Sequence, residues 1–213
     1  MPDALLPADT REQEAMGTNR PVGRHLILVK HALPIVVPGS PPAQWSLSDE
    51  GRASCTTLAA HLRRYYPAQI AASDEPKAAE TAQLLAAALG HTSPVRHDHD
   101  LREHERRPED FFDSTTAFHA ALRRFFAQPD ALVFGQETAT AAGTRFAAAI
   151  ARQLAAAPGG NLIAVAHGTV ISLFAAAHAG LAPFPLWQSL GLPSYVILSL
   201  PHLRHIETRA TIG

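Results

Sequence analysis

The chain has 213 residues, of which 46% are hydrophobic and 17% are charged, and its formal net charge is −1 at pH 7. A chain of this length can bury a sizeable core as one domain, and this composition argues against intrinsic disorder and against a broad nucleic-acid-binding surface. Its single cysteine, Cys55, excludes an intramolecular disulfide and an all-cysteine metal site, which fits a reducing, cytoplasmic setting. We interpret Cys55, which lies in a helical pattern, as a buried structural thiol.

The first segment of the chain, residues 1–22, contains prolines and charged residues but no apolar run. We expect a flexible tail there rather than a secretory signal. No later stretch approaches the roughly 20 apolar residues that a membrane-spanning helix needs, so no membrane association is expected.

Beyond this tail, apolar strand-like runs alternate with alanine-rich segments of helical length. A first strand is expected at residues 25–30, followed by a proline-containing loop and a helix for which Ser48 is the predicted N-cap. A second strand at 69–73 precedes a second helix that stops at Gly90. The later predicted elements are a short strand within 93–103, helices within 108–128 and 136–157, a strand at 161–168, a helix at 169–180 and a strand at 195–200.

This order of elements predicts an α/β domain over residues 23–213, built as a three-layer sandwich with a mainly parallel central sheet flanked by helices. We expect residues 104–136, called the cap segment below, to form a small helical insertion near the site. The cap segment is rich in phenylalanine, with Phe111, Phe112, Phe118, Phe125 and Phe126.

Two histidines occupy matching positions at the ends of two apolar runs. His31 follows "LILVK" and His167 follows "LIAVA", 136 positions later. Ligands of parallel α/β sheets bind beyond the carboxyl ends of the strands, so both imidazoles are expected to face one pocket. His167 is followed by Gly168 and Thr169 at the start of a helix, where free backbone N–H groups favour an anion.

Two lysines belong to the same predicted edge of the sheet. Lys30 directly precedes His31, and Lys77 lies in the first turn of the second helix, where its charge opposes the helix dipole unless an anion compensates it. The lysines, the imidazoles and the helix N-terminus together predict an anion pocket. The chain has no Walker-type glycine loop, which argues against a nucleotide cradle of that kind.

With these residues in view, the chain resembles the histidine phosphatase superfamily, also called phosphoglycerate-mutase-like, over roughly residues 24–200. The sequence Lys30-His31-Ala32 is similar to the Arg-His-Gly hallmark of that family. Three further segments are similar to its later signatures, and a fourth carries the second histidine: "LSDEGRASCTTLAAHL", "SDEPKAAETAQLLA", "DLREHE" and "AVAHG".

The resemblance implies a phosphomonoester hydrolase of the histidine acid phosphatase type, with a small-molecule substrate and no metal or other cofactor. It implies that His31 is the nucleophile that forms a phosphohistidine, and neutral imidazole is a competent nucleophile near pH 7. Glu103 is the implied general acid, a role that needs a raised pKa, which burial can supply; Glu105 is the rival for it. The implied phosphate-binding groups are Lys30, Lys77, His167 and the backbone of Gly168 and Thr169.

The sequence departs from the family pattern where lysine replaces the usual arginine, at Lys30 and at Lys77. Lysine preserves the charge but loosens the geometric control that bidentate arginine gives. Ala32 replaces glycine, and the apolar "LPIVVP" replaces polar residues that often follow. An apolar loop beside the phenylalanine-rich cap segment suggests a substrate with an organic body rather than a sugar phosphate.

Other interpretations stay open at this point. The lysine replacements are compatible with a non-catalytic phospholigand-binding protein, which would not need Glu103 in the pocket, and a cofactor-dependent phosphomutase is a third possibility. The H-x-H spacing of His97 and His99, with His104 nearby, is also compatible with a metal-binding site. Segments that mix arginine with aromatic residues, such as "LRRFF", are typical of nucleic-acid binders, although the slightly negative net charge argues against that function. Trp187 and Tyr195 indicate core packing or, alternatively, a homodimer surface.

Overall fold

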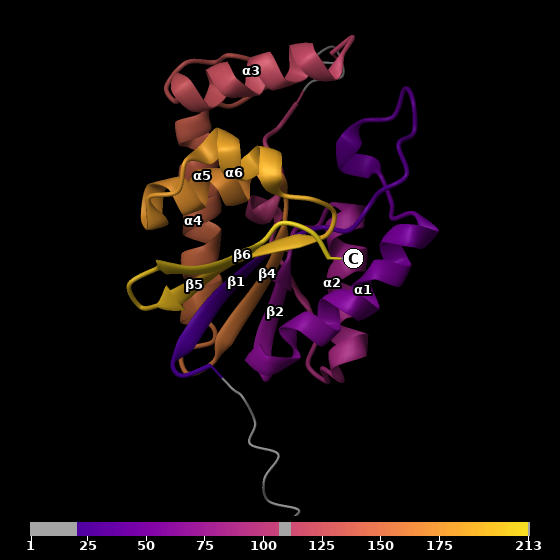
Figure 1. Ribbon diagram of the computed structural model, residues 1–213, viewed down its shortest axis with the longest axis vertical. Helices are drawn as coiled ribbons and strands as arrows, with labels where there is room; N and C mark the ends of the chain where they lie inside the picture. Colours follow the sequence, from indigo (N-terminus) through magenta and orange to yellow (C-terminus); the bar gives the residue numbers. More distant parts are fainter. Residues whose placement is uncertain (1–20, 107–111, 213) are drawn as a thin grey trace, which may run out of the picture.

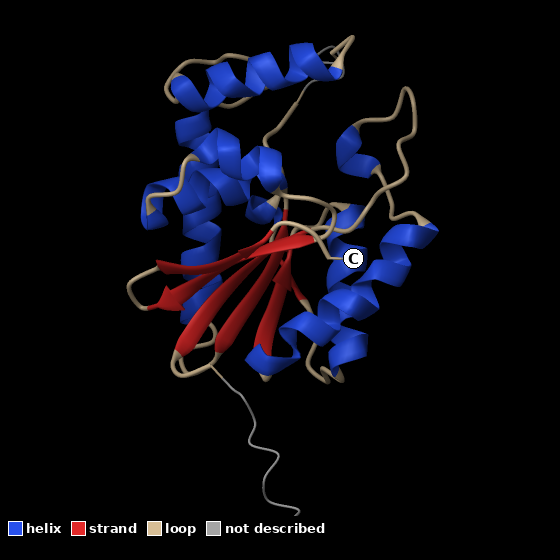
Figure 2. Ribbon diagram, in the orientation of Figure 1, coloured by secondary structure: helices blue, strands red, loops and turns tan. Residues whose placement is uncertain are grey.

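The computed structural model describes residues 21–106 and 112–212 (Figure 1). Most of the expected tail, residues 1–20, and residues 107–111 of the cap segment lie outside the described residues. The described strands form one sheet (Figure 2). It has six strands in the order β3-β2-β4-β1-β5-β6. The strands are β1 (Arg24–Lys30), β2 (Ala68–Ala72), β3 (Arg96–His97), β4 (Asn161–Ala166), β5 (Ser194–Leu200) and β6 (Arg204–Arg209).

The neighbouring strands β3, β2, β4 and β1 are parallel, whereas β5 and β6 are antiparallel to their neighbours. This confirms the predicted α/β fold with a mainly parallel central sheet flanked by helices. Lys30 is in register with Ala166, so β1 and β4 end side by side. The positions that follow these two strands are therefore neighbours, although they are far apart in the sequence.

The helices cover both faces of the sheet (Figures 1 and 2). Along β1, Leu26 and Leu28 pack with the core that includes α4 and α5, while Ile27 and Val29 pack with the core that includes α1 and α2. Because successive side chains of a strand point to opposite faces, one apolar strand serves both cores. The helices are α1 (Asp49–Leu62), α2 (Pro76–Leu89), α3 (Thr115–Ala127), α4 (Ala139–Ala155), α5 (Gly168–Ala179) and α6 (Pro183–Ser189), with 3₁₀ turns η1 (Pro42–Gln44), η2 (Arg63–Tyr65) and η3 (His99–Leu101).

The predicted helix boundaries hold best where a cap residue marks them. The Ser48 side chain accepts a hydrogen bond from the Gly51 N–H at the start of α1, and α2 ends at Gly90, whose φ of 71° is left-handed. The helix expected within 108–128 begins only at Thr115, because Ser114 is its N-cap.

Helix α3 of the cap segment lies over α6, and an aromatic cluster joins them (Figure 1). Phe125 and Phe184 are buried in this cluster, and Phe118 and Trp187 pack against it. Trp187 therefore contributes to packing, as does Tyr195, which is 1% exposed.

Cys55 is buried, and its thiol donates a hydrogen bond to the Gly51 carbonyl at 3.4 Å. Burial, reinforced by the negative charge of Glu80, raises the pKa of the Cys55 thiol to about 11. The thiol is therefore protonated at neutral pH, in keeping with a structural role. Among the helices of the described residues, none combines the length and the apolar character needed to cross a bilayer.

Candidate active site

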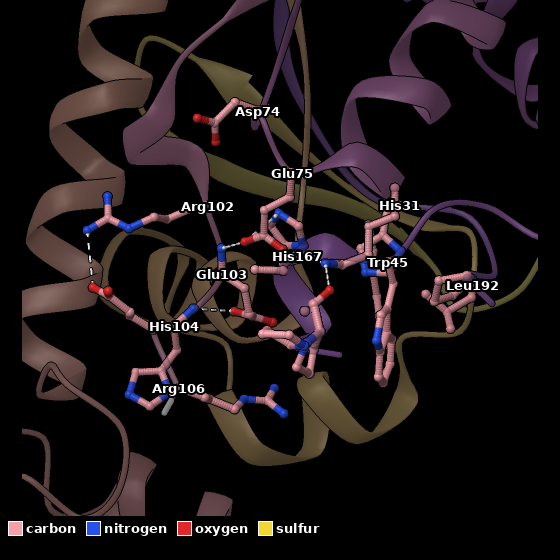
Figure 3. Close-up of a pocket in the computed structure, with 18 of the residues that line it drawn as sticks. His31, Trp45, Asp74, Glu75, Arg102, Glu103, His104, Arg106, His167 and Leu192 are labelled. Carbon is pink, nitrogen blue, oxygen red and sulfur yellow. Dashed lines mark hydrogen bonds and ion pairs between the residues drawn. The ribbon is translucent and has the colours of Figure 1, made fainter. Parts of the chain in front are cut away.

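The two strand-end histidines meet at one cavity, as the sequence predicts. The rings of His31 and His167 have centroids 5.2 Å apart, and both side chains are buried. They line a cavity of about 540 Å³ together with Lys30, Lys77 and Glu103 (Figure 3). The cavity opens beyond the carboxyl ends of β1, β2 and β4, where parallel sheets place their ligands.

The hydrogen bonds of His31 determine which of its nitrogens carries the proton. Its Nδ1 lies 2.8 Å from the carbonyl oxygen of Ala32. Because that oxygen can only accept, Nδ1 must donate, and the lone pair of the neutral ring is on Nε2. Burial, together with the positive charges of Lys77 and Lys30, holds the pKa of His31 well below its ordinary value. His31 is therefore a neutral imidazole with a free nucleophilic nitrogen.

The loop after His31 is fixed by hydrogen bonds to two helices. The Ala32 N–H donates to the hydroxyl oxygen of Thr81 in α2 at 3.0 Å, and the Ser48 hydroxyl donates to the Leu33 carbonyl at 3.0 Å. A Cβ on Gly51 would lie 2.2 Å from that carbonyl oxygen. Glycine at position 51 thus allows the first turn of α1 to approach the loop closely.

Glu103 reaches the cavity and occupies the N-terminus of α5. Its carboxylate accepts hydrogen bonds from the backbone N–H groups of His104 at 2.9 Å, Thr169 at 3.1 Å and Val170 at 3.3 Å. The anion that sequence reasoning expected at this helix N-terminus is therefore, in this structure, the protein's own carboxylate. Gly168 lines the cavity, whereas the Thr169 N–H is already used by Glu103.

The protonation of Glu103 differs from the expectation. Burial raises the pKa of its carboxyl group, but the positive charge of Arg106 and the hydrogen bonds from the backbone N–H groups of His104 and Thr169 lower it, and the pKa lies below its ordinary value. Glu103 is thus ionised at neutral pH when no substrate is bound. Glu105, the rival acid, has a side chain that is 47% exposed and lies 3.7 Å from Arg102. Burial therefore favours Glu103 as the carboxylate of the cavity floor.

Both lysines are tethered by backbone carbonyl oxygens. Lys30 Nζ donates to the Leu190 oxygen at 2.6 Å, and Lys77 Nζ donates to the Pro42 oxygen at 2.7 Å. Burial lowers the pKa of Lys30, although the nearby Glu103 carboxylate opposes this effect. An ammonium group has three N–H donors, so each lysine keeps at least one for a ligand after its backbone tether.

Sequence reasoning missed Glu75, which is 9% exposed and pairs with Lys77. The other carboxylate oxygen of Glu75 accepts a hydrogen bond from the Glu103 N–H at 2.8 Å and lies 3.5 Å from Nε2 of His167 (Figure 3). A signal was available: Glu75 follows β2 at the same edge of the sheet, two residues before Lys77. Its carboxylate links three of the predicted site residues.

His167 is fully buried, and neither ring nitrogen has a hydrogen-bond partner within the described part of the chain. Burial, with repulsion from Lys77, lowers its pKa to about 3. The neutral ring keeps one N–H donor, which is available to a ligand in the cavity.

The outer walls of the cavity are mostly apolar and come from three separate segments. The loop between β1 and α1 contributes Pro41, Pro42, Ala43 and Trp45, α3 contributes Phe118, and the region of α6 and the following loop contributes Trp187 and Leu192. Arg106 lies over the Phe118 ring, 4.7 Å from its centroid. A charged floor is therefore combined with aromatic and proline walls.

A family model of the histidine phosphatase superfamily (branch 1) matches residues 41–205, well over half of the chain. The chain belongs to the histidine phosphatase superfamily. The matched range begins after His31, so His31 is placed in the site by the fold.

Solved structures of histidine phosphatases have the same fold. The native mycobacterial glucosyl-3-phosphoglycerate phosphatase is 22% identical, with a TM-score of 0.70 over 90% of this chain and 100% of that one. YhfR of Bacillus stearothermophilus is 19% identical, with a TM-score of 0.69 over 90% and 98%. A phosphoserine phosphatase mutant from Entamoeba histolytica is 13% identical, with a TM-score of 0.65 over 87% and 96%. The sequence matches no curated protein.

The metal interpretation receives no support from the described residues, among which no group of three or more potential ligands is placed to hold an ion. The short strand β3 ends at His97, so His97 and His99 do not share a strand face, and His99 pairs with Asp74 at 2.8 Å. His104 is buried, with the Phe125 ring centroid 4.4 Å away.

Two arginines of the arginine–aromatic segments make packing contacts with aromatic rings. Arg123 of α3 lies over the ring of Phe184, 4.3 Å from its centroid, and Arg106 lies over Phe118. Such pairs stabilise the aromatic cluster between α3 and α6 through cation–π attraction.

Proposed function

We propose that this chain is a metal-independent phosphomonoester hydrolase that acts through a phosphohistidine at His31. The observation that carries the proposal is the neutral His31 ring, whose Nε2 lone pair is free in a cavity that also contains Glu103. In the first step Nε2 attacks phosphorus, the bond from phosphorus to the ester oxygen breaks, and Glu103 gives a proton to the leaving oxygen.

In the second step Glu103, now a carboxylate, takes a proton from water, and the resulting hydroxide attacks the phosphohistidine. Phosphate leaves and neutral His31 is restored. Lys30, Lys77 and the N–H of His167 stabilise the negative charge on the phosphoryl oxygens. Glu103 must carry a proton when the substrate is bound, and the negative charge of a bound phosphate favours that state by raising the pKa of a nearby carboxyl group.

The first experiment is rapid-quench detection of acid-labile phosphorylation together with phosphate release from a generic aryl phosphate. We expect the wild type to label and turn over, and His31→Ala to lose both. Glu103→Gln is expected to retain labelling with a good leaving group and to hydrolyse the intermediate slowly, because only the second step then needs the base. Labelling in His31→Ala equal to the wild type would contradict the assignment.

A non-catalytic phospholigand-binding protein remains the alternative. The position of Glu103 in the cavity favours the enzyme, since a binding protein has no need of a carboxylate beside the phosphate site. If the wild type neither labels nor turns over but binds inorganic phosphate, the alternative is correct. A mutase would instead transfer the phosphoryl group to a second hydroxyl of the substrate, which product analysis detects.

The cavity also supports a substrate class. Its volume of about 540 Å³ falls in the range of pockets that enclose drug-sized ligands, so it accommodates far more than a phosphoryl group. Trp45, Phe118 and Trp187 line the outer part, and such walls favour an apolar or aromatic body over a polyhydroxylated sugar. A preference of the purified protein for small sugar phosphates over aryl phosphates would contradict this class. A cytoplasmic location and a homodimer remain predictions from the sequence.

A further inference from the structure

The carboxylate of Glu75 is unusual in a pocket for an anion. It is buried, it pairs with Lys77, and it lies 3.5 Å from His167 Nε2. A carboxylate in this place weakens the attraction of the pocket for phosphate, because it opposes the positive charge that holds the ligand. Its presence therefore needs an account beyond phosphate binding.

The two lysines and the two carboxylates on the floor of the cavity cancel each other's charge in the absence of a ligand, and Arg106 adds one positive charge from the wall. Lys30 and Lys77 are positive, Glu75 and Glu103 are negative, and the two imidazoles are neutral because burial lowers the pKa of each. A phosphate ester dianion entering this floor brings two negative charges close to two carboxylates, that of the buried Glu75 and that of the half-buried Glu103. Like charges at such short range in a partly buried site are costly unless one of them is neutralised.

We propose that Glu75 makes phosphate binding depend on the uptake of one proton by the cavity floor. Glu75 acts as the counter-charge of Lys77, so that the dianion binds only together with a proton. The proposal deepens the proposed function, because the proton taken up on binding is the one that Glu103 gives to the leaving oxygen. Glu75 is a positioning residue in this account and does not touch the reacting atoms.

The groups around Glu75 come from every neighbouring element. Lys77 belongs to α2, His167 follows β4, and Glu103 follows η3. Further ion pairs lie in the cavity wall, namely Asp74 with His99 at 2.8 Å and Arg102 with Glu105 at 3.7 Å, and Arg145 of α4 pairs with Glu137 behind it. The titratable groups of the cavity floor are Lys30, His31, Glu75, Lys77, Glu103 and His167, and those that line the rest of the cavity are Asp74, His99, Arg102, His104, Glu105 and Arg106.

The test measures the affinity for sulfate, a tetrahedral dianion that does not titrate near neutral pH, by calorimetry from about pH 6 to about pH 8. Linkage predicts that an anion bound with one proton loses about tenfold in affinity for each unit of rising pH. We expect a slope approaching that value in the wild type. The apparent enthalpy is also expected to change with the ionisation enthalpy of the buffer, which measures the proton directly and needs no variant.

Glu75→Gln keeps the shape of the side chain and removes its charge. We expect it to bind sulfate more tightly than the wild type at about pH 8, with a slope below twofold per pH unit. Glu80→Gln is the matched control, because Glu80 lies on α2, which begins directly after Glu75, pairs with Arg52 at 2.6 Å and does not line the cavity. It should keep the wild-type slope.

A wild-type affinity independent of pH and of buffer, or the absence of sulfate binding, would overturn the proposal. So would a slope in Glu75→Gln equal to that of the wild type, since the pH dependence would then arise without Glu75, from Glu103 alone or from Lys30. These outcomes are separate from the proposed hydrolase function, because sulfate binding requires no turnover and phosphohistidine formation is tested independently.

Discussion

The hydroxyl of Thr81 connects the loop after His31 to the first turn of α2, which carries Lys77. It is fully buried, accepts a hydrogen bond from the Ala32 N–H at 3.0 Å and donates to the Lys77 carbonyl at 2.7 Å. Ala32 in turn orients His31 through the hydrogen bond from Nδ1. One side chain therefore holds the backbone on both sides of the cavity floor.

Thr81→Val should leave the buried Ala32 N–H without an acceptor while keeping the shape of the side chain. We expect a loss of about 1–3 kcal/mol in the free energy of unfolding, measured in urea, and a lower kcat with aryl phosphate. Thr81→Ser retains the hydroxyl and should restore kcat. Equal stability and kcat for Thr81→Val and the wild type would show that the hydroxyl does not hold the loop.

The buried neutral histidines predict a dependence of stability on pH. The pKa of His167 is lowered to about 3, against an ordinary value of 6.5, and that of His31 is lowered in the same direction. Below pH 6.5 the unfolded chain binds these protons and the folded chain does not. The free energy of unfolding should therefore be greatest above about pH 6.5 and fall as the pH falls toward 3, by up to about 1.4 kcal/mol per pH unit for each histidine.

Urea unfolding at about pH 7 and about pH 5 measures this loss. His167→Asn removes one of the two groups, and we expect it to lose less stability between the two pH values than the wild type loses. His61 of α1 is only partly buried, and its side chain makes no ion pair or hydrogen bond within the described residues. His61→Asn is therefore the control and should retain the wild-type loss.

Single residues also show where sequence reasoning succeeds at the site. His31 and His167 could be found because each ends an apolar run, a pattern that local sequence contains. The partners of Glu75 could not be found in the same way. Its carboxylate accepts a hydrogen bond from the Glu103 N–H, and Glu103 belongs to a segment after η3 that folds back onto the turn after β2. Contacts of this kind depend on the tertiary fold.

At the scale of elements, Arg145 of α4 holds the segment that carries Glu103. Its guanidinium donates to the carbonyl oxygens of Asp100 at 2.8 Å, Arg102 at 3.1 Å and Glu103 at 3.2 Å, and it pairs with Glu137. An irregular segment is thus fixed by one side chain of a regular helix, which a planar five-donor group can do.

Arg145→Met should release this segment. We expect kcat to fall roughly tenfold or more with a smaller change in KM, because displacement of a catalytic group by about 1 Å costs up to 10²-fold in rate. Arg152→Met is the control on the same helix: Arg152 is half exposed and its ion pairs with Asp98 and Asp100 contribute little. If Arg145→Met were as active as Arg152→Met, Arg145 would not be needed to hold the segment that carries Glu103.

The elements that sequence reasoning missed have weak local patterns. Helix α6 begins with "PFPLW", which reads as a loop, although proline at the first helical position is well tolerated. Strand β6 has the sequence "RHIETR", whose mainly polar residues give no apolar alternation. Its position as an edge strand beside β5 removes the need for an apolar face on both sides.

At the scale of the whole molecule, the floor and the walls of the cavity come from different parts of the chain. The floor lies at strand ends of the central sheet, whereas the walls belong to the loop before α1, to the cap segment and to α6. Changes in the walls should therefore alter substrate preference with little effect on phosphoryl transfer.

Phe118→Ala tests this separation, because Phe118 lines the cavity from α3. We expect kcat/KM for an aryl phosphate to fall about tenfold, in line with the loss of a buried aromatic contact, while kcat/KM for a small phosphomonoester changes little. Phe126→Ala, a truncation in the same aromatic cluster away from the cavity, should reduce neither. An equal loss of kcat/KM on both substrates would show that Phe118 supports the fold rather than substrate selection.

The two edge strands of the central sheet have a consequence for self-assembly. One edge strand is β3, which is only two residues long, and the other is β6, whose six residues include Arg204, Glu207 and Arg209. A short edge strand and a charged edge strand are both poor templates for pairing with a strand of another molecule. The sheet is thus protected against growing from one molecule into the next, and any specific pairing of two copies would have to use helices or loops.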